Sequence, residues 1–127
     1  MNKKTFKVVP IILAAFIVTL GLNKIRFRYD WVDAAKRTLL APLTGTLWAD
    51  GFSEAKFAKV KLGMSLAEVK ALLGAPLREW CGPKGINEGC TWLYSWQDTP
   101  TADYDRRWVS FDALGRVEEI RHDFYID

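Results

Sequence analysis

The chain has 127 residues, enough for one small domain and a further segment, and half of its residues are hydrophobic. Its formal net charge of +3 comes from residues 1–28, which contain six basic residues and no acidic one. The rest of the chain is mildly acidic and has no stripe of Lys and Arg, which argues against a nucleic-acid-binding protein.

The first segment has the pattern of an export signal. Lys3, Lys4 and Lys7 precede residues 8–22, a run of fifteen residues without a charge. As a helix this run would be about 22 Å long, shorter than the ~30 Å hydrocarbon core of a bilayer. A cleaved signal peptide and an uncleaved anchor are both consistent with this pattern.

The residues after the run favour the anchor. Lys24, Arg26 and Arg28 follow directly, and basic residues there disfavour processing and translocation, while residues 19–21 are a poor cleavage site. We expect residues 1–28 to form a signal-anchor or transmembrane segment that reaches the membrane through residues 8–22. Positive charge flanks both ends of the run, so charge orients the segment only weakly.

Residues 29–50 are expected to link this segment to a domain. Trp31, Ala35 and Leu39 have helical spacing on one face, and Pro42 ends the pattern. One interpretation is a juxtamembrane helix or a flexible tether. The other is an interfacial helix on anionic lipid, supported by the basic residues Arg26, Arg28, Lys36 and Arg37.

The domain, residues 51–127, is predicted to begin with two helices. The first covers residues 53–61, with Ser53 as its cap and Phe57 and Val60 facing inward. The second covers residues 66–73. Ser65 and Glu68 form a capping box before it, and Gly74 and Pro76 end it. Its apolar stripe consists of Leu66, Val69, Leu72 and Leu73.

Strand-like segments follow at residues 77–80, 91–96, 106–112 and 116–126, with a compact hairpin at residues 112–115. Residues 98–105 read as a solvated loop. Two helices followed by an antiparallel sheet of three to four strands predict an α+β two-layer sandwich.

Alternation along the strands predicts their faces. Val109 and Phe111 share one face of their strand, and Trp108 takes the other. In the preceding strand, Trp92, Tyr94 and Trp96 are expected to oppose Leu93. The large aromatic side chains either fill a small core or form an exposed contact surface. The candidate partner-binding residues are Trp92, Tyr94, Trp96 and Trp108.

Cys81 and Cys90 are the two cysteines of the chain. The loop between them is rich in glycine and joins two predicted neighbouring strands, so the two residues lie within disulfide reach. An export segment indicates an oxidising compartment. We expect a structural disulfide, and free thiols are the main alternative. A redox role would need a C-x-x-C spacing and a zinc site would need four ligands, and the sequence has neither.

No residues form a catalytic constellation in the sequence. His122 is adjacent to Asp123 on a predicted strand, and adjacent strand residues point to opposite faces. The glycines have turn roles and form no phosphate-binding motif. We therefore expect no enzyme, no cofactor, no metal site and no small-molecule substrate.

Three motifs carry a resemblance to a known family. They are residues 57–76, with Phe57, Val60, Gly63-Met64-Ser65, Glu68-Val69 and Leu72-Leu73-Gly74-Ala75-Pro76, then Trp92 to Tyr94, and then Val109 to Val117 with Phe111-Asp112 and Gly115. These motifs resemble the SmpA/OmlA (BamE-like) family of bacterial envelope proteins over residues 52–126 at most. The chain has no cysteine directly after the hydrophobic run, so the lipid anchor of the lipoproteins in that family is not implied.

The resemblance implies the α+β fold and a role in outer-membrane protein assembly or envelope integrity. Together with the N-terminal segment, it predicts a single-pass inner-membrane protein whose periplasmic domain binds another envelope protein. The family fold is shared with β-lactamase-inhibitor-like proteins that present an aromatic face to an enzyme. The alternative is therefore an inhibitor or regulator of an envelope enzyme, and a small enzyme is a weaker third.

Overall fold

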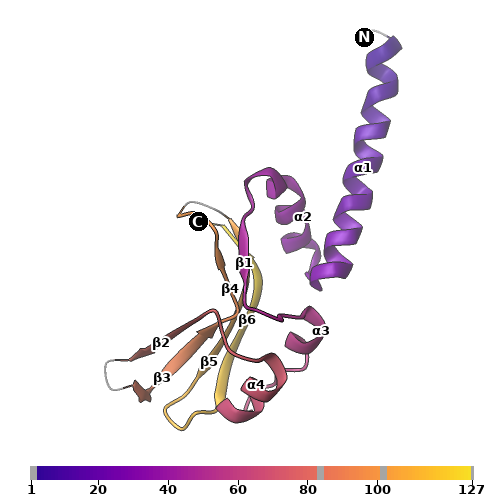
Figure 1. The fold of residues 1–127 in the computed structure, drawn as a ribbon. Helices are drawn as coiled ribbons and strands as arrows, with labels where there is room; N and C mark the ends of the chain where they lie inside the picture. Colours follow the sequence, from indigo (N-terminus) through magenta and orange to yellow (C-terminus); the bar gives the residue numbers. More distant parts are fainter. Residues whose placement is uncertain (1–2, 83–84, 101–102, 127) are drawn as a thin grey trace. The chain divides into compact units, whose positions relative to one another are not determined.

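A computed structural model of the chain describes residues 3–82, 85–100 and 103–126 (Figure 1). The chain divides into two compact units, Met1–Pro42 and Leu43–Asp127, which are described separately. The second unit begins before residue 51, the expected domain start, because residues 46–48 of the predicted linker form a strand of its sheet structure.

The first unit is helical. Helix α1 (Lys3–Phe27) has 25 residues and a length of about 37 Å. Its segment Val8–Phe27 is long and apolar enough to cross a membrane. The helix continues beyond the uncharged run, because Asn23 to Phe27 keep helical geometry although they include Lys24 and Arg26. The prediction of an N-terminal apolar helix is confirmed.

Helix α2 (Trp31–Leu40) is present where the spacing predicted it. The carboxylate of Asp30 accepts a hydrogen bond of 2.8 Å from the backbone N–H of Asp33 and caps the helix. A 3₁₀ turn, Ala41–Leu43, contains Pro42 and follows directly. Within this unit α2 is fixed to α1, since Asn23 Nδ2 donates to Thr38 Oγ1 at 3.0 Å.

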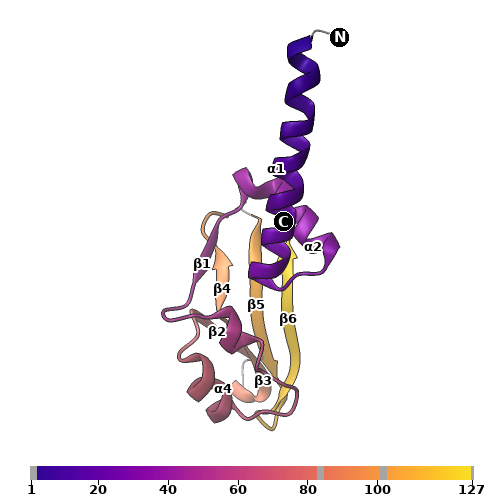
Figure 2. The same cartoon turned by 90° about the vertical axis from the view of Figure 1, so that its right-hand side faces the viewer.

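The second unit contains two antiparallel sheets (Figures 1 and 2). The larger sheet has the order β2 (Arg78–Gly82), β3 (Gly85–Leu93), β5 (Tyr104–Phe111), β6 (Val117–Tyr125). The smaller sheet pairs β1 (Thr46–Trp48) with β4 (Ser95–Gln97). The predicted α+β class is confirmed, but the expectation of a single sheet is wrong, since β1 was not recognised as a strand.

Two short helices cover one face of the larger sheet. Helix α3 (Glu54–Phe57) is capped by Ser53 but is shorter than the predicted 53–61. Helix α4 (Leu66–Leu73) has the predicted bounds. Its capping box is complete, because Ser65 Oγ accepts from Glu68 N at 3.1 Å and the Glu68 carboxylate accepts from Ser65 N at 2.7 Å.

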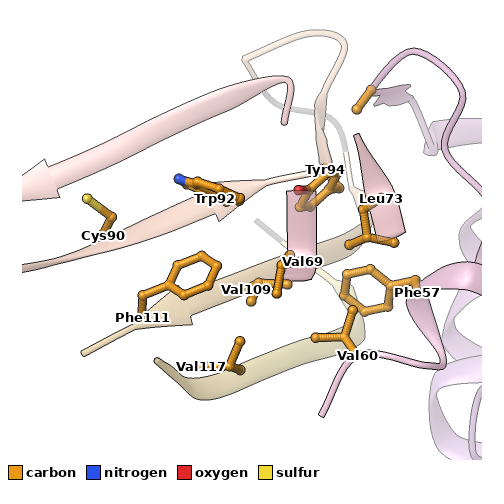
Figure 3. Packing of buried hydrophobic residues seen from close by; sticks show 11 residues of the cluster. Phe57, Val60, Val69, Leu73, Cys90, Trp92, Tyr94, Val109, Phe111 and Val117 are labelled. Carbon is orange, nitrogen blue, oxygen red and sulfur yellow. The ribbon is translucent and has the colours of Figure 1, made fainter. Parts of the chain in front are cut away.

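The core lies between these helices and the sheet (Figure 3). Figure 3 shows side chains of α3, α4 and the segment between them meeting strand side chains, and the cluster includes Phe57, Val60, Val69, Leu73, Trp92, Tyr94, Val109, Phe111 and Val117. The Tyr94 hydroxyl donates to the Gly74 carbonyl at 3.0 Å, which ties the end of α4 to the sheet. Burial raises the pKa of this hydroxyl.

The predicted solvated loop 98–105 is wrong at its C-terminal end. Asp103, Tyr104 and Asp105 are buried, and β5 begins at Tyr104. Asp105 N donates to the Thr46 hydroxyl at 3.0 Å, so β1 supplies the partner that buries this segment. Residues 101–102 of that loop and residues 83–84 of the loop between the cysteines lie outside the described residues.

Candidate functional site

The larger sheet has a second face, opposite the helices. Residues directly paired in an antiparallel sheet point to the same side. The register pairs Trp80 with Thr91 and Thr91 with Ser110. The next row on the same face pairs Leu93 with Trp108, which pairs with Arg121. Trp80 and Trp108 therefore share the face that α3 and α4 leave uncovered.

Three tryptophans form a cluster on this face. The rings of Trp80 and Trp96 are 5.0 Å apart at 82°, and those of Trp80 and Trp108 are 5.3 Å apart at 74°. Trp96 and Trp108 stack at 5.7 Å and 18°. These are favourable edge-to-face and stacked geometries. Trp80 is 45% exposed, so the cluster presents an indole to its surroundings.

Arginines extend the cluster. The guanidinium of Arg78 lies 5.5 Å from the Trp96 ring centroid. That of Arg106 lies 5.2 Å from the Trp108 ring and 4.7 Å from the Tyr125 ring. Arg106 Nε also donates to the Asp123 carboxylate at 2.7 Å, and this hydrogen bond raises the pKa of Arg106. Its planar group is thus held in place between aromatic rings and a carboxylate.

A groove of about 620 Å³ lies over these side chains. Its lining combines aromatic and basic residues with hydroxyl and amide groups and one carboxylate, that of Glu119, and includes Trp80, Trp96, Trp108, Arg106, Tyr125 and Gln97. Such a lining suits recognition by stacking, cation–π contact and hydrogen bonding. Among the residues that the structure describes, no group of three or more His, Cys, Asp or Glu side chains could hold a metal ion. The groove has the chemistry of a binding surface, and we name it the aromatic groove.

The four candidate partner-binding residues do not lie together. Trp96 and Trp108 line the aromatic groove, whereas Trp92 and Tyr94 are in the core, 7% and 0% exposed. The expectation that Trp92, Tyr94 and Trp96 share a face is wrong for Trp96. The strand is interrupted at Tyr94, between β3 and β4, and a one-residue irregularity moves the following side chains to the other face.

Sequence reasoning missed Trp80 as part of the groove. The signal that could have found it is the pair of cysteines. Cys81 and Cys90 are direct partners in the β2–β3 register and form a disulfide, as predicted. A disulfide between these two residues fixes Trp80 opposite Thr91. Trp80 must then point away from the core that contains Cys90.

A second polar cluster lies where α3 meets the sheet. The fully buried Arg107 has its Nη2 atom 2.8 Å from Glu54 Oε1, and His122 Nε2 lies 3.2 Å from Glu54 Oε2. Burial opposes ionisation of Glu54, but the hydrogen bond from His122 and the charge and hydrogen bonds of Arg107 outweigh it and lower its pKa. The cluster neutralises a buried guanidinium and fixes α3 to the sheet.

The structure also separates His122 from Asp123, as alternation predicts. Asp123 binds Arg106 on the groove side, whereas His122 contacts Glu54 on the helix side. Sequence reasoning missed the Glu54–Arg107 pair, because 53 residues separate its members and neither belongs to a recognisable motif.

No family model matches the chain, and no curated protein matches it. The features of this chain that bear on function are the anchor-like helix, the disulfide and the aromatic groove.

Proposed function

We propose that this chain is a single-pass inner-membrane protein of the bacterial envelope whose folded unit is periplasmic and binds another protein through the aromatic groove. The apolar segment Val8–Phe27 supports the anchor, since 20 helical residues span about 30 Å.

The disulfide supports the periplasmic position of the folded unit. Disulfides persist in oxidising compartments such as the bacterial periplasm and are rare in the cytosol. The bond between Cys81 and Cys90 therefore favours an oxidising side of the membrane for the C-terminal unit. The N-terminus then lies in the cytoplasm. The flanking charges add little to this orientation, since Lys3, Lys4 and Lys7 before the apolar run are matched by Lys24, Arg26 and Arg28 after it.

The observation that carries the binding proposal is the half-exposed Trp80, edge-on to Trp96 and Trp108. Trp, Tyr and Arg are the residues enriched at the energetic centres of protein interfaces. Here the three types share one groove, on the side of the sheet opposite the helices. A partner that inserts an apolar side chain would cover Trp80, and Arg78, over the Trp96 ring, suits an acidic group at the rim of the contact. Arg121 at the groove is already paired with Glu119 at 2.8 Å.

The biological role within this proposal follows from the motifs in residues 57–76, 92–94 and 109–117. Their resemblance to the SmpA/OmlA family supports a role in outer-membrane protein assembly or envelope integrity. The second candidate is inhibition or regulation of an envelope enzyme, and the exposed aromatic surface is the observation that favours it, since such a surface can enter the cleft of an enzyme.

Capture of partners from membranes tests the proposal. The full chain, tagged at its C-terminus, is crosslinked in membranes, extracted with detergent, purified and analysed by mass spectrometry. The variants are Trp80→Ala and, as a matched control, Leu62→Ala, since Leu62 is 68% exposed and does not line the aromatic groove.

We expect the wild type and Leu62→Ala to capture the same envelope protein and Trp80→Ala to lose it. Capture of barrel-assembly components supports the first role, whereas capture of a hydrolase supports the second. If all three proteins capture the same partner equally, the groove is not the binding site.

A further inference from the structure

Helix α2 has an exposed apolar face. Trp31, Val32 and Leu39 are 62%, 62% and 67% exposed, and at 100° per residue they lie on one side of the helix together with Ala35. Outside this face lie the fully buried Ala34 and Arg37, which bonds to Asn23 of α1, whereas Thr38, the other partner of Asn23, lies at the edge of the face beside Trp31. Three adjacent large apolar side chains on a ten-residue helix form a surface that is unfavourable in water.

The contacts between the two helices fix the level of α2 along α1. The apolar run of α1 ends at Leu22, and the polar residue Asn23 follows it. Asn23 donates to Thr38 at 3.0 Å and accepts from Arg37 Nη1 at 3.1 Å. The C-terminal end of α2 is therefore level with the end of the apolar run, and its start lies near the basic residues that follow (Figure 1).

Basic residues surround this helix pair. Residues 24–37 contain five basic and two acidic side chains. Lys24 Nζ lies 4.9 Å from the Trp31 ring centroid, and the Arg37 guanidinium lies 3.9 Å from that of Phe27. One of the two acidic residues, Asp33, pairs with Lys36 at 3.2 Å, so positive charge remains in excess beside the apolar face.

We propose that α2 is an interfacial helix whose Trp31–Val32–Leu39 face is covered by bilayer lipid, with anionic headgroups against the basic residues 24–37. The inference rests on the proposed function in one respect, namely that α1 spans the membrane. Continuity supports the occupant, because the exposed apolar surface of α1 includes the level where α2 is attached: Leu22 and Ile25, on either side of Asn23, are 61% and 78% exposed. Charge supports it as well, since an apolar helix face flanked by Lys and Arg binds anionic membrane surfaces.

The proposal predicts an order of depth in the bilayer. Single-cysteine variants Ile12→Cys, Val32→Cys, Leu39→Cys and Lys59→Cys of the full chain are spin-labelled in vesicles of phosphatidylcholine and phosphatidylglycerol. The native cysteines form a disulfide and do not react with the label. Collision with oxygen and with a nickel chelate, measured by power saturation in electron paramagnetic resonance, reports depth. We expect Ile12 to be deepest, then Leu39, then Val32, with Lys59 in water.

The depth measurement tests the interfacial position of α2 and the membrane anchor α1 separately. If Ile12 is in the bilayer and Leu39 has the water-like collision ratio of Lys59, α2 is not interfacial and the inference is overturned while the anchor stands. If Leu39 is shielded from both reagents, the face packs on protein, which also overturns the inference. If the label at Ile12 is in water, α1 does not span the membrane, and both the anchor of the proposed function and this inference are wrong.

A second experiment tests whether the basic residues 24–37 bind anionic headgroups. Spin-labelled phosphatidylglycerol and phosphatidylcholine are compared for the fraction immobilised by the full chain in vesicles. We expect a larger immobilised fraction for phosphatidylglycerol, and we expect Arg26→Gln/Arg28→Gln and high salt each to reduce the difference. Equal fractions for the two lipids would overturn the assignment of anionic headgroups to the basic residues.

Discussion

Arg107 of β5 is fully buried, and its guanidinium nitrogen lies 2.8 Å from a carboxylate oxygen of Glu54 in α3. The pair joins the shortest helix of the folded unit to the centre of its sheet. Because a buried cation is costly when its counter-charge is removed, the Glu54 carboxylate contributes to holding α3 on the sheet, together with the core side chain of Phe57.

Replacing Glu54 with Gln should therefore destabilise the folded unit by about 3 kcal/mol. Arg121→Gln is the matched control, since Arg121 pairs with Glu119 at 2.8 Å but both side chains are more than 40% exposed. That exposed pair should contribute less than about 1 kcal/mol. Chemical unfolding of the full chain in detergent measures both, and equal small losses would mean that the buried pair does not fix α3.

The Glu54 carboxylate should also make the stability of the folded unit depend on pH under acidic conditions. The pKa of Glu54 is lowered from 4.5, because its bonds to His122 and Arg107 outweigh the effect of burial. A lowered pKa in the folded state gives stability that is fully present above the unfolded value and is lost as the pH falls through the folded value. Stability should thus decline below pH 4.5. Unfolding free energies measured at several pH values should show a shallower decline for Glu54→Gln, and identical curves would contradict this origin.

The stability lost on substitution at the N-cap of α4 and within the helix should increase with the burial of the replaced side chain. Ser65→Ala removes the acceptor for Glu68 N and should cost about 1 kcal/mol. Leu73, 4% exposed, contributes to the core, and Leu73→Ala should cost about 2–5 kcal/mol. Leu72 is half-buried, so Leu72→Ala should cost less than Leu73→Ala, contrary to a sequence reading that treats the two alike. Thermal melts of the three variants give the order directly.

Local signals in the sequence predicted much of this fold. The capping box at Ser65 and Glu68, the helix of residues 66–73 and the link between Cys81 and Cys90 each depend on residues close in the chain. Their geometry follows from local hydrogen bonding and from the short loop, so no knowledge of the distant fold is needed.

The features that escaped prediction depend on distant contacts. Residues 46–48 become a strand because β4 pairs with them, and three residues show too little alternation to signal this. Trp96 reaches the groove because the strand is interrupted at Tyr94, which strict alternation does not allow for. Half of the candidate contact residues, Trp92 and Tyr94, therefore belong to the core.

The disulfide should stabilise the hairpin without taking part in binding. Cys81 and Cys90 are nine positions apart, and a loop of this size allows about 2–3 kcal/mol in the chain-entropy treatment. The double variant Cys81→Ser/Cys90→Ser should melt at a lower temperature and still capture the partner at low temperature. Alkylation of denatured, non-reduced protein from membranes should label no thiol, and two labelled thiols would contradict the oxidising location.

Photo-crosslinking at Trp80 in living cells tests the central claim most directly. Trp80, 45% exposed at the aromatic groove, is replaced in the full chain with benzoylphenylalanine, which, unlike alanine, keeps a large aromatic side chain there. Leu62, 68% exposed outside the groove, is replaced in the same way as a matched control. Illumination should give one discrete adduct with another envelope protein from position 80 and none from position 62. No adduct from position 80, or the same adduct from both positions, would contradict binding through the aromatic groove.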